Sequence, residues 1–348
     1  MVLQIKGSKM HSKENDPVMM RTPTSPPAIA ALAPSVKRPL WSVMIPAYNC
    51  SNYLREAMKS VLAQDPGAEK MQIEVIDDCS TDEDVAALVE EIGKGRIGFF
   101  RQEKNVGSLR NFETCLNRSK GVLIHLLHGD DLIKPGFYLE IENLFQQYPQ
   151  AGAAFTAVSY IDKNGKQWFD HKRVSEQRGI IEDWLYKIAQ VQWLEPPAMV
   201  VKRSVYEKLG SFFAVHYGED WEMWIRIAAH FPVAFSPNYL SLYRKHAANI
   251  SAESLLSGQN IRDVLKVIDI VQQYLPPGQR KRLKKSAIRN FSIYFAKMSD
   301  QIFHDYNNPE AALSHAKNAL RMQANKTTVL FLIKLYIKYY IGWKRKLS

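Results

Sequence analysis

The chain has 348 residues, of which 46% are hydrophobic, so it can bury a sizeable core and is not a largely disordered protein. Its net charge of +11 is concentrated at one end. Residues 258–348 hold 17 Lys and Arg against 5 Asp and Glu, or +12, whereas the remainder holds 29 against 30, or −1. A basic end on a near-neutral body predicts an anionic surface as its partner, for which lipid headgroups and nucleic acid both qualify at this stage.

The cysteines and the first residues bear on the cellular setting. Cys50, Cys79 and Cys115 fit neither a zinc site nor a redox pair, and their odd number argues against a disulfide framework. A reducing, cytoplasmic setting is the simplest interpretation. No apolar run follows Lys6 and Lys9, so the pattern of a secretory signal is missing there.

Folded structure is expected to begin after a proline-rich segment. Residues 1–38 are rich in Pro, Ser and Thr and cannot bury enough surface to order themselves, so we expect a disordered leader. The main domain is expected over residues 39–255. It begins with residues 41–46, a short buried strand that a proline stops, and a periodic helix follows over 51–64.

Strands and helices then alternate along the chain. Strands are predicted at 72–76, 97–102 and 122–127, and helices at 82–92 and 111–118. This alternation predicts an α/β fold with a doubly wound, mainly parallel sheet, in which ligands bind at the carboxyl ends of the strands. Asp77-Asp78 and Asp130-Asp131 each lie directly after a predicted strand. Both acidic pairs are therefore expected at the ligand-binding edge of the sheet.

Carboxylates at this edge suit a diphosphate substrate. Breaking the glycosyl–phosphate bond of a nucleotide sugar adds charge to the leaving group, which a divalent cation can neutralise as a Lewis acid. Hard oxygen ligands favour Mg²⁺ or Mn²⁺, and Asp130-Asp131 can supply one. A carboxylate of Asp77-Asp78 can accept a hydrogen bond from a base N–H. Taken alone, each pair is also compatible with an ordinary turn.

A third acidic pair, Glu219-Asp220, precedes residues 221–228, whose apolar positions recur at helical spacing. Acidic residues are favoured at a helix start by the helix dipole, which is the structural explanation. The functional explanation makes Asp220 a general base that takes the proton from an attacking acceptor hydroxyl.

Six short motifs follow one another along the chain: Ser42-Val43-Met44-Ile45-Pro46-Ala47-Tyr48-Asn49, Glu74-Val75-Ile76-Asp77-Asp78-Cys79-Ser80-Thr81-Asp82, Asn105-Val106-Gly107 with Arg110-Asn111, His128-Gly129-Asp130-Asp131, Gly218-Glu219-Asp220 and Tyr243-Arg244-Lys245-His246. In this order they make the chain resemble the family 2 inverting glycosyltransferases of the GT-A fold from about Leu40 to about Ser251. The resemblance implies a doubly wound mixed sheet and an enzyme that uses Mg²⁺ or Mn²⁺. It would move one sugar from a nucleotide-sugar donor to an acceptor hydroxyl with inversion.

The resemblance also implies a role for individual residues. The nucleotide pocket would be lined by Pro46, Ala47 and Tyr48. The base, a pyrimidine, would be bound by Asp78, with Arg110 near the base or the phosphates. The metal site would consist of Asp130, beside the ribose and the metal, Asp131 as ligand, and His246, which approaches the metal or the diphosphate. The catalytic base would be Asp220.

Two departures from common family patterns qualify these roles. His128 stands where many members have an acidic residue, which bears on the metal shell rather than on the fold. The Gln-x-x-Arg-Trp signature of processive members does not occur, so a single addition per encounter is expected. On the acceptor side, Trp193, Trp221 and Trp224 can stack on a sugar, although helical spacing favours a core position for Trp224.

Other functions stay open at this point. A sugar-phosphate nucleotidyltransferase would share the sheet and the metal, but it usually carries a glycine-rich basic signature after the first strand, where this chain has Ala47-Tyr48-Asn49-Cys50. A non-catalytic carbohydrate-binding protein would not need the acidic motifs. A dinucleotide-dependent oxidoreductase is disfavoured because no Gly-x-Gly-x-x-Gly follows the first strand. We expect a glycan or lipid-linked acceptor, in surface polysaccharide or glycolipid synthesis.

Residues 256–348 are predicted to form a helical, basic region. A helix over 329–343 would be about 22 Å long, short of a bilayer core of roughly 30 Å. It would either lie in the membrane interface or pack on the protein, and the sequence does not decide between these. The basic cluster at 280–285 favours anionic lipid. The expected location is therefore cytoplasmic with peripheral contact to the inner face of the plasma membrane, and nucleic acid is not expected as a partner.

Overall fold

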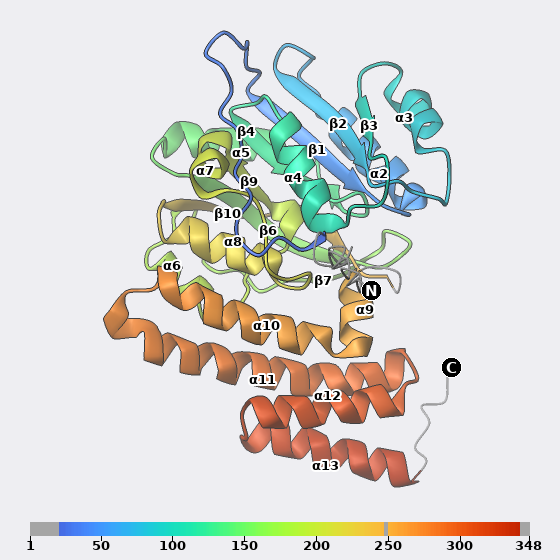
Figure 1. Ribbon diagram of the computed structural model, residues 1–348, viewed down its shortest axis with the longest axis vertical. Helices are drawn as coiled ribbons and strands as arrows, with labels where there is room; N and C mark the ends of the chain where they lie inside the picture. Colours follow the sequence, from blue (N-terminus) through green and yellow to red (C-terminus); the bar gives the residue numbers. More distant parts are fainter. Residues whose placement is uncertain (1–20, 247–249, 342–348) are drawn as a thin grey trace, which may run out of the picture.

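The computed structural model describes residues 21–246 and 250–341 of the chain. A twisted mixed sheet carries helices on both faces, and the helices of the C-terminal region stack below it in successive layers (Figure 1). The strand order is β3-β2-β1-β4-β9-β6-β10-β5, with β7 paired to β6 and β8 to β10. This confirms the predicted α/β fold with a doubly wound mixed sheet and a helical C-terminal extension.

The first half of the sheet is parallel. Its strands and connecting helices are β1 (Trp41–Ala47), α2 (Ser51–Leu62), β2 (Met71–Asp77), α3 (Val85–Gly93), β3 (Gly98–Arg101), α4 (Ser108–Arg118) and β4 (Leu123–Leu126). Side chains alternate across the sheet, so Met44 and Ile76 pack on the side of α4 while Val43 and Val75 pack on the side of α2 and α3. Both faces are covered, which explains why these strands read as continuous apolar runs.

The second half mixes parallel and antiparallel pairs. Its strands are β5 (Leu132–Ile133), β6 (Ala153–Ile161), β7 (Gln167–Asp170), β8 (Gly179–Ile180), β9 (Met199–Lys202) and β10 (Val233–Arg244). Its helices are α5 (Phe137–Gln147), α6 (Trp184–Ile188), the 3₁₀ turn η1 (Pro196–Ala198), α7 (Arg203–Leu209) and α8 (Glu219–Ala228). The strand direction reverses at β9, which pairs antiparallel with both β4 and β6.

The C-terminal region consists of α9 (Ile250–Ser257), α10 (Gln259–Ile270), η2 (Val271–Tyr274), η3 (Pro277–Gln279), α11 (Arg280–Asp305), α12 (Pro309–Met322) and α13 (Lys326–Ile341). It shares a core with the sheet domain, since Phe291 of α11 packs on Trp221 of α8 with ring centroids 4.6 Å apart. The outermost layer is α13 (Figure 1). Within the described part of the chain, no helix is both long and apolar enough to cross a membrane.

The segment expected to be a disordered leader differs from that expectation over residues 21–38. Ile29 is buried in the main core, and the carbonyl oxygens of Pro23 and Pro27 accept hydrogen bonds from Ala214 N and Ser211 N. Proline lacks an N–H but keeps its carbonyl, so a proline-rich segment can still pair with a loop that offers free amides. The first part of the predicted leader, residues 1–20, lies outside the described residues.

Candidate active site

The end of β1 brings the first two acidic pairs together. The carbonyl oxygen of Ala47 accepts a hydrogen bond from Asp78 N (2.8 Å), and that of Pro46 accepts one from Gly129 N (3.1 Å). A Cβ on Gly129 would lie 2.9 Å from Cys50 Sγ and 3.1 Å from Pro46 O, so this close approach requires glycine. The turns after β2 and β4 therefore meet at one place, at the carboxyl edge of the sheet.

Asp78 is buried and held by the Asn105-Val106-Gly107 motif. Its Oδ1 accepts a hydrogen bond from Val106 N (2.7 Å), and its Oδ2 accepts from Gly107 N (2.9 Å) and Asn105 Nδ2 (3.0 Å). Burial raises the pKa of Asp78, and these amide hydrogen bonds oppose the shift. The first predicted nucleotide-binding residues, Pro46 and Ala47, are buried beneath this turn, whereas Tyr48 is half-exposed.

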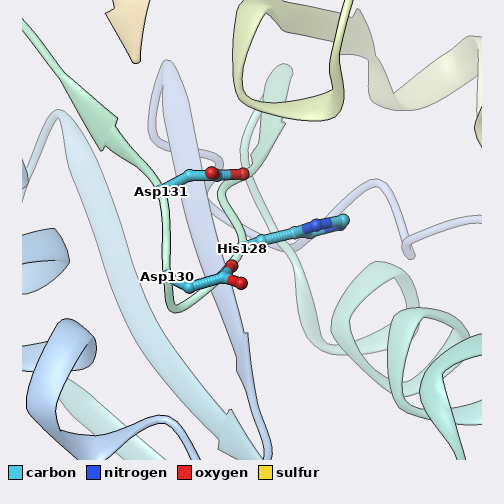
Figure 2. A group of neighbouring side chains, drawn as sticks. All are labelled: His128, Asp130 and Asp131. Carbon is cyan, nitrogen blue, oxygen red and sulfur yellow. The ribbon is translucent and has the colours of Figure 1, made fainter. Parts of the chain in front are cut away.

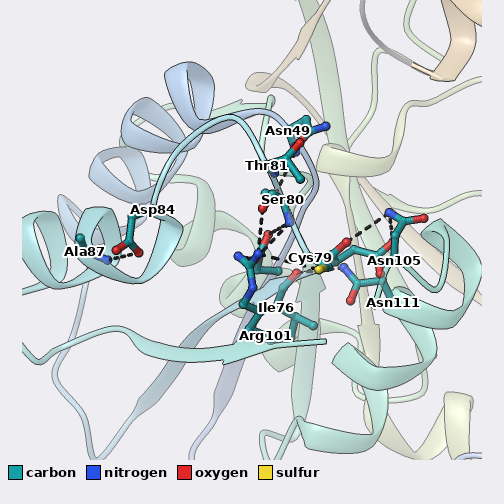
Figure 3. Close-up of polar contacts among 12 residues, drawn as sticks. Asn49, Ile76, Cys79, Ser80, Thr81, Asp84, Ala87, Arg101, Asn105 and Asn111 are labelled. Carbon is teal, nitrogen blue, oxygen red and sulfur yellow. Dashed lines mark hydrogen bonds and ion pairs between the residues drawn. The ribbon is translucent and has the colours of Figure 1, made fainter. Parts of the chain in front are cut away.

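The other member of this acidic pair, Asp77, has a structural environment. Its carboxylate accepts hydrogen bonds from Ser80 N (3.1 Å) and from Arg101 Nη1 (2.5 Å). Figure 3 shows Arg101 against this turn, with Asn49 opposite, where Asn49 Oδ1 accepts a hydrogen bond from Thr81 N (2.7 Å). These contacts fix the turn that carries Asp78.

The turn after β4 forms a cluster of potential metal ligands. One ligand atom each of His128, Asp130 and Asp131 lies within 4.8 Å of the other two, and all three side chains project to the same side of the turn (Figure 2). Asp131 is fully buried, and its Oδ2 has no hydrogen-bond partner among the described residues. Burial, with the neighbouring charge of Asp130, raises the pKa of Asp131 well above its usual range. Such an unpaired, buried oxygen fits a cation.

The end of β10 completes this cluster from another part of the sheet. His246 Nε2 lies 2.9 Å from Asp130 Oδ2, and Arg244 Nε donates to Asp130 O over 2.8 Å. The pKa of Asp130 is lowered because the hydrogen bond from His246 and the nearby His128 outweigh its burial. His246, which was predicted to approach the metal, therefore contacts Asp130 at this site. The histidine that lies within the cluster of potential ligands is His128.

Asp220 lies at the start of α8 in a small pocket that it shares with His128. The walls of the pocket are mostly apolar and include Phe112, Phe212 and Trp224. Burial, with the charge of Glu195 as the next cause, raises the pKa of Asp220 to about 7. Gln192 Nε2 donates to Asp220 Oδ2 over 2.7 Å and orients the carboxylate. A buried carboxylate that titrates near neutral pH is suited to general-base chemistry.

Three further residues lie near the site that the sequence motifs do not indicate. Glu195 precedes η1 and accepts a hydrogen bond from Tyr160 Oη. Gln192 lies in the same loop, and Arg21 donates to Asn105 Oδ1 from the segment predicted to be disordered. None belongs to a motif, so only the fold brings them to the site. Of the predicted nucleotide contacts, Arg110 pairs with Glu113 on its own helix (2.6 Å), and its role stays a prediction.

The tryptophans suggested for acceptor stacking lie mostly in the core. Trp221 is fully buried and its Nε1 donates to Ile188 O over 2.7 Å. Trp224 is nearly buried, as its helical spacing indicated, and contributes to the wall of the pocket beside Asp220. Trp193 is partly exposed and lies near Lys172.

The chain is similar to known glycosyltransferases in sequence and in fold. Residues 42–210 match the family model described as glycosyl transferase family 2. The chain is 29% identical over 248 residues to an uncharacterized glycosyltransferase of Nostoc sp., covering 67% of this chain and 74% of the relative.

Two solved structures share the fold. One is Staphylococcus aureus TarS 1-349 in complex with UDP-GlcNAc, at a TM-score of 0.61 and 14% identity, covering 87% of this chain and 92% of that one. The other is the mannosyltransferase PcManGT from Pyrobaculum calidifontis in complex with GDP-Man and Mn²⁺, at a TM-score of 0.53 and 17% identity, covering 92% and 85%. The fold is similar to that of the GT-A glycosyltransferases. Residues 42–210 of this chain belong to glycosyltransferase family 2.

Proposed function

We propose that this glycosyltransferase moves a single sugar from a nucleotide-sugar donor to an acceptor hydroxyl with inversion, assisted by Mg²⁺ or Mn²⁺. One observation carries the proposal: Asp220, whose pKa is raised to about 7, shares a pocket with His128 of the acidic turn. The proposed proton acceptor and one member of the cluster suited to a cation, His128, therefore line the same space.

The donor is proposed to bind across the end of β1. Asp78 would accept a hydrogen bond from an N–H of the nucleotide base. Pro46 and Ala47, which are buried, would form the floor of the donor site, and Tyr48 is exposed at its edge. Asp131 and Asp130, with His128 beside them, would hold the cation, with His246 fixing Asp130. When bound, the cation neutralises the charge on the departing diphosphate.

Inversion follows from a single displacement. The acceptor oxygen attacks the anomeric carbon from the side opposite the diphosphate, the new carbon–oxygen bond forms as the glycosyl–phosphate bond breaks, and Asp220 takes the hydroxyl proton. Gln192 holds Asp220 Oδ2, which leaves the carboxylate oriented for this transfer. One base and one displacement account for the reaction without a covalent intermediate.

The acceptor is proposed to be a glycan or a lipid-linked glycan, as in surface polysaccharide or glycolipid synthesis. Exposed aromatic side chains support a saccharide: on β7, Trp168 is 62% and Phe169 45% exposed. Phe169 stacks on Tyr160 at 4.5 Å, and Tyr160 donates to Glu195, whose charge acts on Asp220. The exposed aromatic rings of β7 are thus connected to the proposed catalytic base, Asp220, through Tyr160 and Glu195. We expect a sugar ring of the acceptor to stack on them.

A peripheral membrane contact through α13 is proposed as well. Leu330, Ile333 and Ile337 are each more than half exposed on α13, and Tyr340 is 77% exposed. These positions follow helical spacing and form one apolar face of α13, which is the outermost helix (Figure 1). Lys334 and Lys338 pair with Asp300 of α11 (2.8 and 2.6 Å), so they anchor α13 to the protein and orient this face outward. Residues 342–348, which include the last basic cluster, lie outside the described residues.

The proposal is tested by incubating the full chain with nucleotide sugars and Mn²⁺ and following the released nucleotide. Release of a nucleoside diphosphate, with an axial donor sugar becoming equatorial in the product by NMR, is the expected result. A retained anomeric configuration would contradict inversion. Release of pyrophosphate from a nucleoside triphosphate and a sugar phosphate would instead identify a nucleotidyltransferase.

A further inference from the structure

The start of the described chain lies against the proposed base-binding carboxylate. Arg21 Nη2 donates to Asn105 Oδ1, and Arg21 Nε is 3.1 Å from the position that a Cβ on Gly107 would occupy. Asn105 and Gly107 are also the residues that donate to Asp78 Oδ2. The Arg21 guanidinium and the Asp78 carboxylate therefore flank the same two residues.

The backbone around Arg21 is fixed. Thr22 Oγ1 lies 2.6 Å from His216 Nε2, and the next residue, Pro23, accepts a hydrogen bond from Ala214 N (2.9 Å). The segment continues past α8 and α4 toward β1 (Figure 1). The Arg21 side chain is itself exposed to solvent. A fixed backbone with an exposed cationic side chain can meet a ligand at little cost in ordering.

The three hydrogen bonds that the Asp78 carboxylate accepts leave it the capacity to accept one more. An ionised carboxylate has about four acceptor positions. Oδ2 already accepts two hydrogen bonds, from Gly107 and Asn105, whereas Oδ1 accepts one, from Val106. Arg21 contacts Asn105 and Gly107, which hold Asp78, and its charge acts on that carboxylate. A carboxylate with acceptor capacity left on Oδ1 and a nearby guanidinium together match a base edge in which a ring N–H adjoins a carbonyl oxygen. Uracil and guanine have such an edge, and cytosine and adenine do not.

We propose that Arg21 is a specificity-determining residue of the donor site, which donates to a base carbonyl oxygen while Asp78 accepts the adjacent ring N–H. This inference rests on the proposed function, since it needs a nucleotide at Asp78. It assigns the donor to the uridine or guanosine class, and it gives the N-terminal segment a part in substrate recognition.

The test is isothermal titration of the full chain with UDP, GDP and CDP in the presence of Mn²⁺. We expect the unmodified protein to bind UDP or GDP at least tenfold more tightly than CDP. Arg21→Ala should weaken that preferred nucleotide about tenfold, as expected for one charge-assisted hydrogen bond, and leave CDP unchanged. Lys37→Ala is the matched control: it removes one positive charge from the same segment, at an exposed side chain paired with Glu69.

The outcomes separate this inference from the proposed function. Unchanged or tighter binding of the preferred nucleotide by Arg21→Ala would overturn the inference and leave the transferase proposal standing. Equal weakening of all three nucleotides would also overturn it, because Arg21 would then act on the phosphates. If the unmodified protein bound none of the three, the proposed function would fail, and the inference with it. Equal thermal midpoints for the three proteins would establish that the substitutions leave the fold intact.

Discussion

The backbone amide of Arg244 donates a hydrogen bond to Asp131 Oδ1 over 2.9 Å, although 113 residues separate the two in the sequence. Arg244 ends β10 and Asp131 immediately precedes β5, which pairs with β10, so the sheet itself fixes this carboxylate. The other oxygen, Oδ2, is buried without a partner among the described residues. Such an arrangement costs free energy in the unliganded protein and is suited to cation binding.

Replacing Asp131 by Asn should separate stability from metal binding. The substitution removes a buried charge, so without metal we expect the free energy of unfolding to be unchanged or higher by about 1 kcal/mol. Mn²⁺ should raise the thermal midpoint of the unmodified protein but not that of Asp131→Asn. Calorimetry with EDTA and with Mn²⁺ measures both effects, and Asp305→Asn, at an exposed position, is the control. Equal stabilisation of Asp131→Asn by Mn²⁺ would exclude Asp131 as a ligand.

The strand pattern located Asp78 and Asp131 because position after a strand is a local property that the sequence carries. Convergence at the end of β1 then follows from the general arrangement of parallel strands. Glu195 and Gln192 were not predictable in this way. They lie in an irregular loop before η1, and their approach to Asp220 depends on how β9 and α8 pack. No local sequence pattern predicts contacts of this kind between distant parts of the chain.

The N-terminal segment shows that amino-acid composition alone does not predict whether a segment is ordered. Proline content predicted disorder for residues 21–38, but disorder depends on whether a partner surface offers amides and an apolar site. Here Ser211 and Ala214 offer the amides, and Ile29 finds a place in the core. A single apolar residue among prolines is too weak a signal to predict this.

Ile29→Ala measures how firmly that segment is held. Truncating a buried isoleucine typically costs about 2–5 kcal/mol, so we expect a clear fall in the thermal midpoint. Leu139→Ala, at a leucine that is 64% exposed on α5, should change stability by less than about 0.5 kcal/mol. Equal midpoints for Ile29→Ala and the unmodified protein would mean that the segment does not pack on the domain.

Replacing Ile333 and Ile337 together by Ser should weaken membrane binding. Both side chains are about half exposed on α13, and each would lose its burial among lipid chains. We expect at least a tenfold loss of binding to vesicles of phosphatidylglycerol and phosphatidylcholine in a flotation assay. Leu139→Ser, on α5 of the sheet domain, is the control. Vesicle binding that survives the double substitution, or a dimer that the substitution dissociates, would contradict the proposed membrane contact.

Asp220→Asn should lower kcat by about 10²–10⁴-fold, the usual contribution of a general base. Binding of the nucleoside diphosphate should be unchanged, because the carboxylate acts on the acceptor hydroxyl. Single-turnover kinetics and nucleotide titration measure the two quantities separately. Glu176→Gln, at an exposed glutamate paired with Arg173, is the control and should retain most of the activity. Full activity in Asp220→Asn would remove the proposed base.

The pH dependence of the reaction tests the link between Glu195 and Asp220. A base must be ionised to accept a proton, and burial with the charge of Glu195 raises the pKa of Asp220 to about 7. The rate kcat should therefore be constant above that pH and fall about tenfold per unit below it. Glu195→Gln removes one of the two causes, so the pKa of Asp220 should decrease and the acid limb should shift to lower pH. Glu176→Gln, at an exposed glutamate paired with Arg173, should leave the limb in place. A limb that does not move in Glu195→Gln would mean that burial alone sets the pKa of this base, and that Glu195 contributes to the site only through Tyr160.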